Sequence, residues 1–318
     1  MATVVLGLGT AHSPQMSVPW DQWAVLREKD ETDTRFDYAA LLQRARPDLE
    51  RELTPDVWRA RSEACQQAIG VLSERLRAAR PDAIVVVGDD QHEQFLDDNL
   101  PVVAIYNGDS MSLARGRDRG VPTWKAVEER SWAATAPEYP AAPELANHLI
   151  GALVDDDFDV ARANRLRDGV GIGHAFAFLY RRLWADDPPP VVPVMLNTYY
   201  PPNQPTPRRC YALGQALRRA VESWDHDARV AIMASGGLSH VIMDEDLDRL
   251  TLDAMQRKDR DALCALPRER LRGGTSEILN WVALAGAMEQ VPMTLLDYVP
   301  AYRSPAGTGC GAAFAYWQ

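Results

Sequence analysis

The chain has 318 residues, and its 34 Lys and Arg against 45 Asp and Glu give a formal net charge of −11 at pH 7. Hydrophobic residues make up 46% and charged residues 25%, which is typical of a globular protein and excludes a disordered chain, a coiled coil or a collagen-like fibre. Because counterion release needs a local excess of Lys and Arg, the acidic balance argues against a general nucleic-acid or anionic-membrane binder.

The cysteines and the first residues indicate the compartment. Four cysteines, none in CxxC spacing, are too few for a disulfide framework and favour a reducing environment. Residues 1–7 carry no basic segment and run directly into a strand pattern, which is not typical of a signal peptide. No apolar run approaches the roughly 18 residues of a membrane span. We therefore expect a cytoplasmic protein with neither nucleic-acid nor membrane partners.

Strand-like and helix-like segments alternate along the chain. We predict strands at 4–8, 83–87, 101–106, 191–197, 229–235, 293–298 and 312–317. Between them we predict helices at 38–44, 56–80, 125–134, 144–154, 176–184, 208–224, 244–257 and 276–287. The helix at 38–44 lies within a loop-rich segment at 15–54. The continuous apolar run at 83–87 predicts a central strand that is buried on both faces. Pro193 predicts that the strand at 191–197 lies at an edge or carries a bulge.

This alternation predicts an α/β fold. We expect a single catalytic domain over residues 1–318, with a central mixed, largely parallel sheet flanked by helices and the active site at the carboxyl ends of the strands. The segment 15–54 is then an insertion and a candidate lid.

Three of the six histidines follow shortly after strand-like runs: His12, His92 and His240. Because ligands of open α/β sheets bind outside the carboxyl ends of the strands, three such ends with a histidine each predict one convergent site. The alternative is that each histidine only caps a loop or forms a local hydrogen bond. His174 follows two glycines before a predicted helix, where a structural role is the simpler interpretation.

Glu277 opens the predicted helix 276–287, which is apolar on almost all sides. A glutamate in the first turn is stabilised by the helix dipole, and this alone explains its presence. The functional alternative is a metal ligand, because a buried carboxylate needs a positively charged partner. Two imidazoles and one carboxylate form the facial triad of non-haem Fe(II) oxygenases, while catalytic Zn(II) and Mn(II) use the same ligand count. The spacing of these residues does not choose among the three metals.

Several segments, taken in order, resemble the type III extradiol ring-cleavage dioxygenases, the family of the catalytic β subunit of protocatechuate 4,5-dioxygenase. The most specific is Gly-Gly-Leu-Ser-His at 236–240, close to the family's Gly-Gly-Met-Ser-His. The other matching segments are 11–14 (Ala-His-Ser-Pro), 89–95 (Asp-Asp-Gln-His-Glu-Gln-Phe), 171–176 (Gly-Ile-Gly-His-Ala-Phe, against an Asp-His-Gly element) and 276–281 (Ser-Glu-Ile-Leu-Asn-Trp).

The resemblance implies a function and a role for each residue. It implies that His12, His92 and Glu277 bind Fe(II), that His240 is the acid/base residue near a substrate hydroxyl, and that His174 donates a proton or orients oxygen. The substrates would be a catechol-type molecule and O2, and both oxygen atoms would enter the ring-opened product. A homo-oligomer is compatible with this interpretation, and we favour an enzyme that needs no partner subunit.

The chain departs from the family pattern at two positions. The family usually places its second histidine directly after an Asp, whereas Gln91 stands between Asp90 and His92 here. An alignment on Phe95 would put Gln91 in the ligand position, but imidazole is a better iron ligand than a neutral amide, so we predict His92. At position 173 a Gly stands where an Asp is common, so we expect His174 to lack an orienting carboxylate.

Two other functional classes fit the same residues. A metal-dependent hydrolase or C–C lyase would use the same ligands and histidines and would turn over without oxygen. A non-catalytic binding protein of the same fold would be expected to lose one or more site residues.

Overall fold

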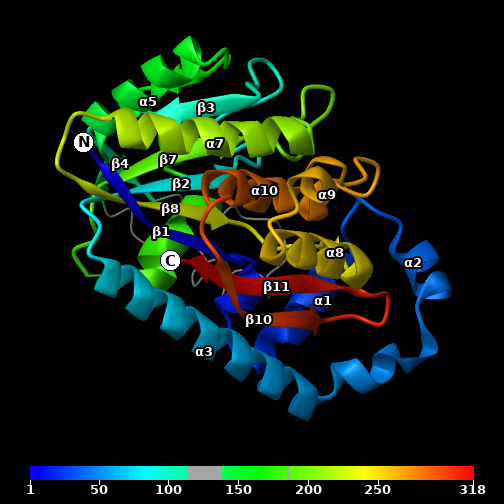
Figure 1. Cartoon of the computed structure of the whole chain (residues 1–318). Helices are drawn as coiled ribbons and strands as arrows, with labels where there is room; N and C mark the ends of the chain where they lie inside the picture. The colour runs from blue at the N-terminus through cyan, green and yellow to red at the C-terminus, as the bar shows by residue number, and fades with distance from the viewer. Residues whose placement is uncertain (114–137, 185) are drawn as a thin grey trace.

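The centre of the structure is built from four strands rich in β-branched and small apolar residues. The computed structural model describes residues 1–113, 138–184 and 186–318 (Figure 1). The central parallel strands, in spatial order, are β1 (Thr3–Thr10), β8 (Arg229–Ser235), β2 (Ala83–Asp89) and β7 (Val191–Leu196). All seven residues of β2 are buried, as the apolar run predicts.

Antiparallel strands extend this parallel centre on both sides. On one side β11 (Thr308–Trp317) pairs with β1, and both β10 (Met293–Tyr302) and β9 (His240–Ile242) pair with β11. On the other side β3 (Val103–Tyr106) is antiparallel to β7, and β6 (Ala161–Ala163) is parallel to β3. The predicted mixed, largely parallel sheet is therefore confirmed. A separate two-stranded sheet joins β4 (Ser110–Ser112) and β5 (Glu138–Pro140).

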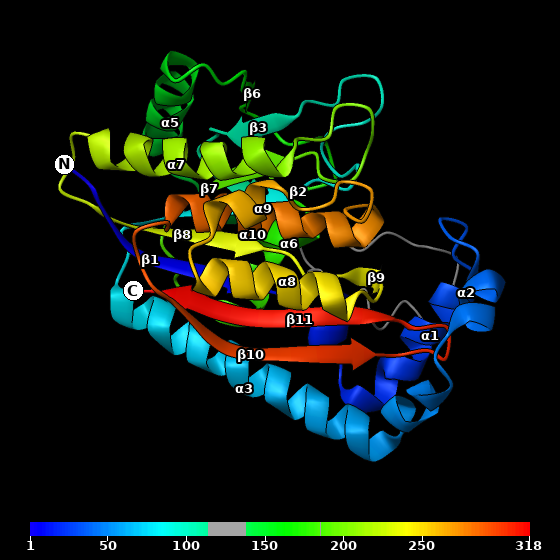
Figure 2. The same cartoon turned by 45° about the vertical axis from the view of Figure 1, so that its right-hand side comes forward.

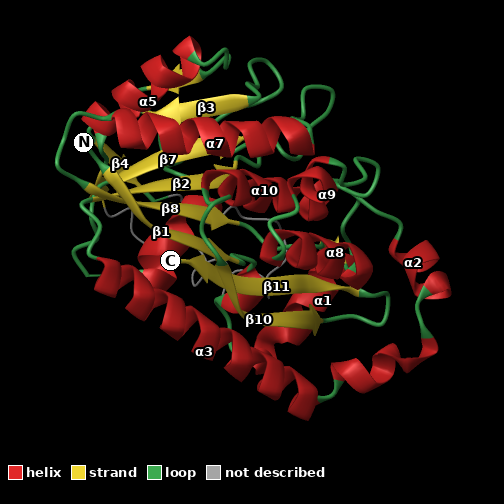
Figure 3. Cartoon of the chain, viewed as in Figure 1, coloured by secondary structure: helices red, strands yellow, loops and turns green. Residues whose placement is uncertain are grey.

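Helices cover both faces of the sheet, so the described residues form a single α/β domain (Figures 1 and 3). In β2, Val85 and Val87 contribute to one apolar core, while Ile84 and Val86 contribute to the other. The first core takes in α5 (Pro143–Asp155), α7 (Pro207–Ser223), α8 (Glu245–Gln256), α9 (Arg260–Cys264) and α10 (Ile278–Ala287). The second takes in α1 (Trp23–Glu31), α3 (Pro55–Ala79), α6 (His174–Phe178) and the π-helical turn Leu179–Leu183.

The contact between α7 and α10 determines where the site residue Glu277 lies. A Cβ atom on Gly214 of α7 would overlap the carbonyl oxygen of Ala283, and one on Gly286 of α10 would overlap that of Tyr211. The two helices therefore touch backbone to backbone, which only glycine permits at these positions. Because α10 begins directly after Glu277, this contact holds the carboxylate at a defined place relative to the sheet.

The insertion 15–54 has more helix than the sequence predicts. The helix expected at 38–44 is confirmed as α2 (Tyr38–Arg44), which carries no buried residue and lies at the periphery in Figure 2. Helix α1 was not expected. It is anchored by fully buried Trp23 and by a buried ion pair in which Nε of Arg303 lies 2.7 Å from Oδ2 of Asp30.

Pro193 does not lie at an edge, and this prediction is wrong. It stands inside β7, opposite Val86 of β2, and β7 is flanked on its other side by β3. The pairing of β3 reaches only to Val194, so Pro193 lies just beyond the stretch where β3 needs a backbone donor. The helix predicted at 125–134 lies outside the described residues. Along the described chain, every helix is too short or too polar to cross a membrane.

Candidate metal centre and active site

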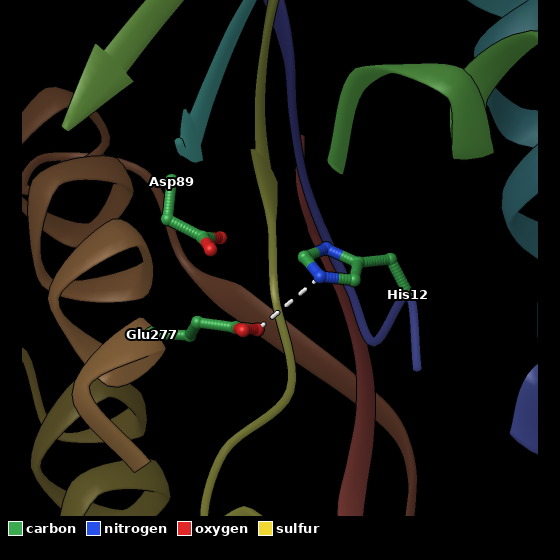
Figure 4. Close-up of side chains that lie close together, drawn as sticks. All are labelled: His12, Asp89 and Glu277. Carbon is green, nitrogen blue, oxygen red and sulfur yellow. Dashed lines mark ion pairs between the residues drawn. The ribbon is translucent and has the colours of Figure 1, made fainter. Parts of the chain in front are cut away.

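Three buried side chains meet where the central strands end. His12 follows β1, Asp89 is the last residue of β2, and Glu277 precedes α10. One possible ligand atom from each lies within 4.8 Å of the others, and the side chains point toward one another in Figure 4. Segments far apart in the sequence therefore converge at the carboxyl end of the parallel strands, as the fold class predicts.

The hydrogen bonds of His12 define which of its nitrogens faces the cluster. Its Nδ1 lies 3.1 Å from Oγ of Ser235, and that hydroxyl donates its proton to the carbonyl oxygen of Ala175 at 2.5 Å. The Ser235 oxygen must therefore accept from Nδ1–H of His12. Consequently Nε2 of the neutral ring carries a lone pair, and it faces Oε2 of Glu277 at 3.4 Å.

The two glycines at 236 and 237 make room for the glutamate and for a second histidine. A Cβ on Gly236 would lie 3.0 Å from Cβ of Glu277, and one on Gly237 would lie 2.9 Å from Nδ1 of His240. Backbone N–H of Gly237 also donates to Oε2 of Glu277 at 3.0 Å. The loop after β8 thus lies directly against the carboxylate of Glu277 and the ring of His240. Residues with a side chain at 236 or 237 would crowd these groups.

His240 is held in the same manner as His12. Its Nδ1 donates to the carbonyl oxygen of Leu238 at 3.1 Å, and its Nε2 lies 2.9 Å from Oε1 of Glu277. Burial acts to lower the pKa of His240, but the charge and hydrogen bond of Glu277 outweigh it and raise the pKa above its ordinary value. The loop before it is fixed by Asp248, whose carboxylate accepts from the backbone N–H and the hydroxyl of Ser239, both at 2.7 Å.

His174 completes a set of three imidazoles. Its Nδ1 lies 2.7 Å from Oε1 of Glu93, and its ring stands edge-on to that of His12 with the centroids 4.7 Å apart. All three histidines thus bond through Nδ1 to the surrounding structure and turn Nε2 toward the site. Burial would lower the pKa of His174, but Glu93 raises it to about 9.

Burial and the charges of neighbouring groups give the three clustered side chains different protonation states. Burial would raise the pKa of Glu277, but His240 and His12 hold it at about 2, so this carboxylate is ionised. Burial lowers the pKa of His12 to about 3, so its ring is neutral. Burial, together with the charge of Glu277, raises the pKa of Asp89 to about 8.

The structure does not bring His92 into this cluster, in contrast to the sequence-based expectation. Its backbone is left-handed, with φ of 58°, and its ring stacks on Tyr200 at a centroid distance of 3.6 Å. Its Nε2 lies 3.3 Å from Oδ1 of the exposed residue Asp97. The side chain that reaches the cluster from this loop is Gln91, whose Nε2 lies 2.9 Å from Oδ2 of Asp89 and 3.2 Å from Oε1 of Glu277.

The neighbouring Asp90 has a structural part in this loop. Its two carboxylate oxygens accept from the backbone N–H groups of Gln94 and Phe95, at 2.8 and 3.0 Å. These bonds fold the loop so that Gln91 turns inward. Sequence reasoning did not select Asp89 or Glu93 as site residues, although the acidic run directly after a buried strand was a signal for both.

The cluster fits a divalent metal ion. Among the described residues, Nε2 of His12 has no hydrogen-bond partner, although it is fully buried, and it faces a carboxylate oxygen. The close approach of Asp89 and Glu277 also calls for a positive charge between them. One imidazole nitrogen and two carboxylate oxygens are donors that Fe(II), Mn(II) and Zn(II) all accept.

A groove lies beside Tyr199, which also contacts the cluster. The hydroxyl of Tyr199 donates to Oε1 of Glu277 at 3.3 Å, and the same residue lines a hollow of about 530 Å³. The wall of this groove also includes Pro201, Pro205 and the basic residues Arg268 and Arg272. Tyr199 therefore contacts both the buried cluster and this hollow.

Comparison with known proteins identifies the family of the chain. Residues 60–310 match the family model described as the catalytic LigB subunit of aromatic ring-opening dioxygenase. The chain belongs to the LigB family. The matched segment contains Asp89, His174, His240 and Glu277, and His12 lies before it.

Two curated relatives of the LigB chain are named as dioxygenases of aromatic compounds. A gallate dioxygenase of Pseudomonas putida is 33% identical over 158 residues, covering 45% of this chain and 45% of the relative. A 2,3-dihydroxyphenylpropionate/2,3-dihydroxicinnamic acid 1,2-dioxygenase of Comamonas testosteroni is 28% identical over 179 residues, covering 56% of this chain and 49% of the relative. The matches thus span about half the length of each relative.

Proposed function

We propose that this protein is a non-haem Fe(II)-dependent extradiol dioxygenase that opens the aromatic ring of a catechol-type substrate with O2. The observation that carries the proposal is the buried meeting of His12, Asp89 and Glu277, with His240 and His174 turning Nε2 toward the same site. Membership of the LigB family and the names of the two relatives support the reaction class.

The proposed ligand set consists of one histidine and two carboxylates, in place of the two histidines and one carboxylate expected from the sequence. His12 and Glu277 would hold the metal together with Asp89, whose carboxylate takes the third corner of the cluster. Gln91 bridges the two carboxylates through its amide nitrogen and so stabilises their arrangement. When bound, the ferrous ion would supply Lewis acidity and a path for electrons from the catechol, which is oxidised, to O2.

The protein's own residues then handle protons and placement. Because Nδ1 of His240 is bonded to Leu238, Nε2 is the atom that can accept the hydroxyl proton of a catechol. His174, whose Nδ1 is bonded to Glu93, holds a proton at Nε2 for return to the ring-opened product. The raised pKa of His174, about 9, keeps it in the protonated state that such a donor needs.

The decisive experiment combines metal analysis with oxygen uptake. The protein is prepared without oxygen and loaded separately with Fe(II), Mn(II) or Zn(II), and each form is given a panel of catechols with and without a carboxylate. Oxygen uptake that matches the formation of a yellow ring-opened product, in the Fe(II) form, supports the proposal. Turnover that is equally fast without oxygen would instead indicate a metal-dependent hydrolase or C–C lyase.

The same experiment tests the non-catalytic alternative. A protein that binds catechols tightly but consumes neither oxygen nor substrate with any metal would be a binding member of the family. The presence of both candidate acid/base histidines, each with its Nδ1 bonded, supports an enzyme.

A further inference from the structure

The loop after β2 carries a buried carboxylate that does not belong to the metal cluster. Oε1 of Glu93 accepts a hydrogen bond of 2.7 Å from Nδ1 of His174 and one of 3.1 Å from the backbone N–H of the same residue. Oε2 accepts from the backbone N–H of Gln91 at 3.3 Å. One side chain therefore ties together the two segments that bring His174 and Gln91 into the site.

Gly173 is matched to this carboxylate. A Cβ atom at position 173 would overlap the Oε2 atom of Glu93. The backbone of Gly173, with φ of −64° and ψ of 168°, is one that any residue adopts, so glycine is needed there for space and not for conformation. Glu93 thus fills the volume that a side chain directly before the histidine would take.

This arrangement determines the direction of the His174 ring. With Nδ1–H donated to Glu93, the opposite nitrogen, Nε2, comes within 3.4 Å of Nε2 of Gln91, and the ring edge faces His12. A carboxylate that accepts from both the ring and the backbone of one residue restrains both χ1 and χ2 of that residue. Rotation of the ring would carry Nε2 away from the cluster.

We propose that Glu93 is a positioning residue, which holds Nε2 of His174 and the loop of Gln91 in the geometry that the reaction uses. The expected effect on turnover rests on the proposed function, whereas the hydrogen bond can be measured without substrate or metal. Glu93 reaches His174 from a distant segment, and its carboxylate fills the space beside Gly173. When Glu93 is removed, an aspartate at position 173 would place a carboxylate in that space, so it should restore the effect on His174.

Four variants distinguish the effect of where the carboxylate lies from the effects of its charge and of added bulk at position 173. Glu93→Ala removes the carboxylate, and Glu93→Gln keeps its shape without the charge. The double variant Glu93→Ala with Gly173→Asp places a carboxylate next to the histidine, in the space that the first change opens. Its matched control, Glu93→Ala with Gly173→Ala, has the same added Cβ without a carboxylate. Glu63→Ala, at an exposed position of α3, controls for the loss of a glutamate.

The first readout is the imidazole N–H resonance of His174 in the metal-free full chain, assigned by its loss in His174→Ala. We expect a low-field signal in the unchanged protein, its loss in Glu93→Ala, and its return only in the variant with Asp at 173. Where Glu93→Ala does not fold, Glu93→Gln decides, because a neutral acceptor should move the signal to higher field. A low-field signal that persists in either variant overturns the proposal.

The second readout is steady-state turnover in the Fe(II)-loaded protein. We expect kcat to fall on the order of 10–100-fold in Glu93→Ala with a smaller change in KM and unchanged metal content, and to recover in the variant with Asp at 173 but not in its control. Equal kcat in Glu93→Ala and Glu63→Ala overturns the positioning role. If the unchanged protein turns over no catechol, the proposed function fails, and the resonance of His174 still decides the role of Glu93.

Discussion

Nε2 of His12 and Oε2 of Glu277 face each other at 3.4 Å, and both atoms are hydrogen-bond acceptors. Two buried acceptors at this distance repel unless a cation or a proton lies between them. The lowered pKa of His12, about 3, means that its own ring does not supply the proton near neutral pH. A divalent metal ion removes this repulsion, and it would also let Asp89, whose pKa is about 8 without metal, ionise beside Glu277.

Changing Asp89 to Asn tests the third ligand. The amide keeps the shape of the carboxyl but lacks its charge, so we expect at least tenfold weaker Fe(II) and Mn(II) binding, equivalent to about 1.4 kcal/mol. Without metal, the fold should be as stable as before, since the pKa of about 8 keeps the Asp89 carboxyl neutral at pH 7 and the amide is also neutral. Metal titration followed by the shift in unfolding temperature measures both effects.

The control for this prediction is His92→Ala. Because His92 stacks on Tyr200 and lies outside the cluster, its removal should leave metal affinity unchanged. Should His92→Ala lose the metal while Asp89→Asn keeps it, the ligand set argued from the structure is wrong and the sequence-based choice of His92 is right.

The sequence was sufficient to find most of the cluster. The positions of His12 and His240 after predicted strands indicate one site, and the family resemblance adds Glu277 to it. The structure brings these three residues together. The structure differs from the expectation at His92 by one residue, because Gln91 and not His92 faces the cluster. The left-handed backbone at His92 turns its side chain away, and no periodicity in the sequence reports such a local conformation.

Two other features could not be found because their cause lies far along the chain. Glu93 meets His174 across 81 positions, and no pattern in either segment predicts this contact. The expectation that His174 lacks an orienting carboxylate is therefore wrong. Pro193 was assigned to an edge on the general rule that proline removes a ladder donor. It is tolerated inside β7 because the neighbouring strand β3 is short, which is a property of the partner and not of the strand itself.

A histidine at position 91 is expected to strengthen metal binding. The side chain of Gln91 already lies beside both carboxylates, and an imidazole nitrogen is a better donor to Fe(II) and Zn(II) than an amide. We expect Gln91→His to raise the affinity for these metals by about tenfold, with Zn(II) gaining at least as much as Fe(II). Competition titration against a chelator measures the change, and an affinity that falls would place residue 91 away from the ion.

Replacing His240 by Phe should separate metal binding from turnover. The change removes the proton acceptor at Nε2 but no proposed ligand, so we expect retained metal and a fall in kcat of about 10²–10⁴-fold. The exposed residue His226, changed in the same way, is the control for a histidine-to-phenylalanine substitution. Loss of metal in His240→Phe, without loss in His226→Phe, would show that His240 acts as a ligand instead.

The free energy of unfolding is expected to vary with pH in part through the titration of Asp248. Burial raises the pKa of Asp248 from 3.8 to about 6, although the hydrogen bonds from Ser239 and Tyr298 act in the opposite direction. Since the folded state binds this proton more tightly than the unfolded chain, protonation of Asp248 contributes to the free energy of unfolding, and this contribution is fully present below about pH 4. It is lost as pH rises through 6, by up to about 3 kcal/mol for a shift of this size.

Asp248→Asn removes this titration and leaves the remainder of the pH profile in place. The free energy of unfolding, measured by urea denaturation in steps from pH 4 to pH 7, should therefore fall less steeply with rising pH in the variant than in the unchanged protein. Because Asp248 also accepts from Ser239, directly before His240, the variant should lose activity as well. Identical slopes in the two proteins between pH 4 and pH 6 would mean that the carboxyl titrates at its ordinary value, so that its three hydrogen bonds fully compensate its burial.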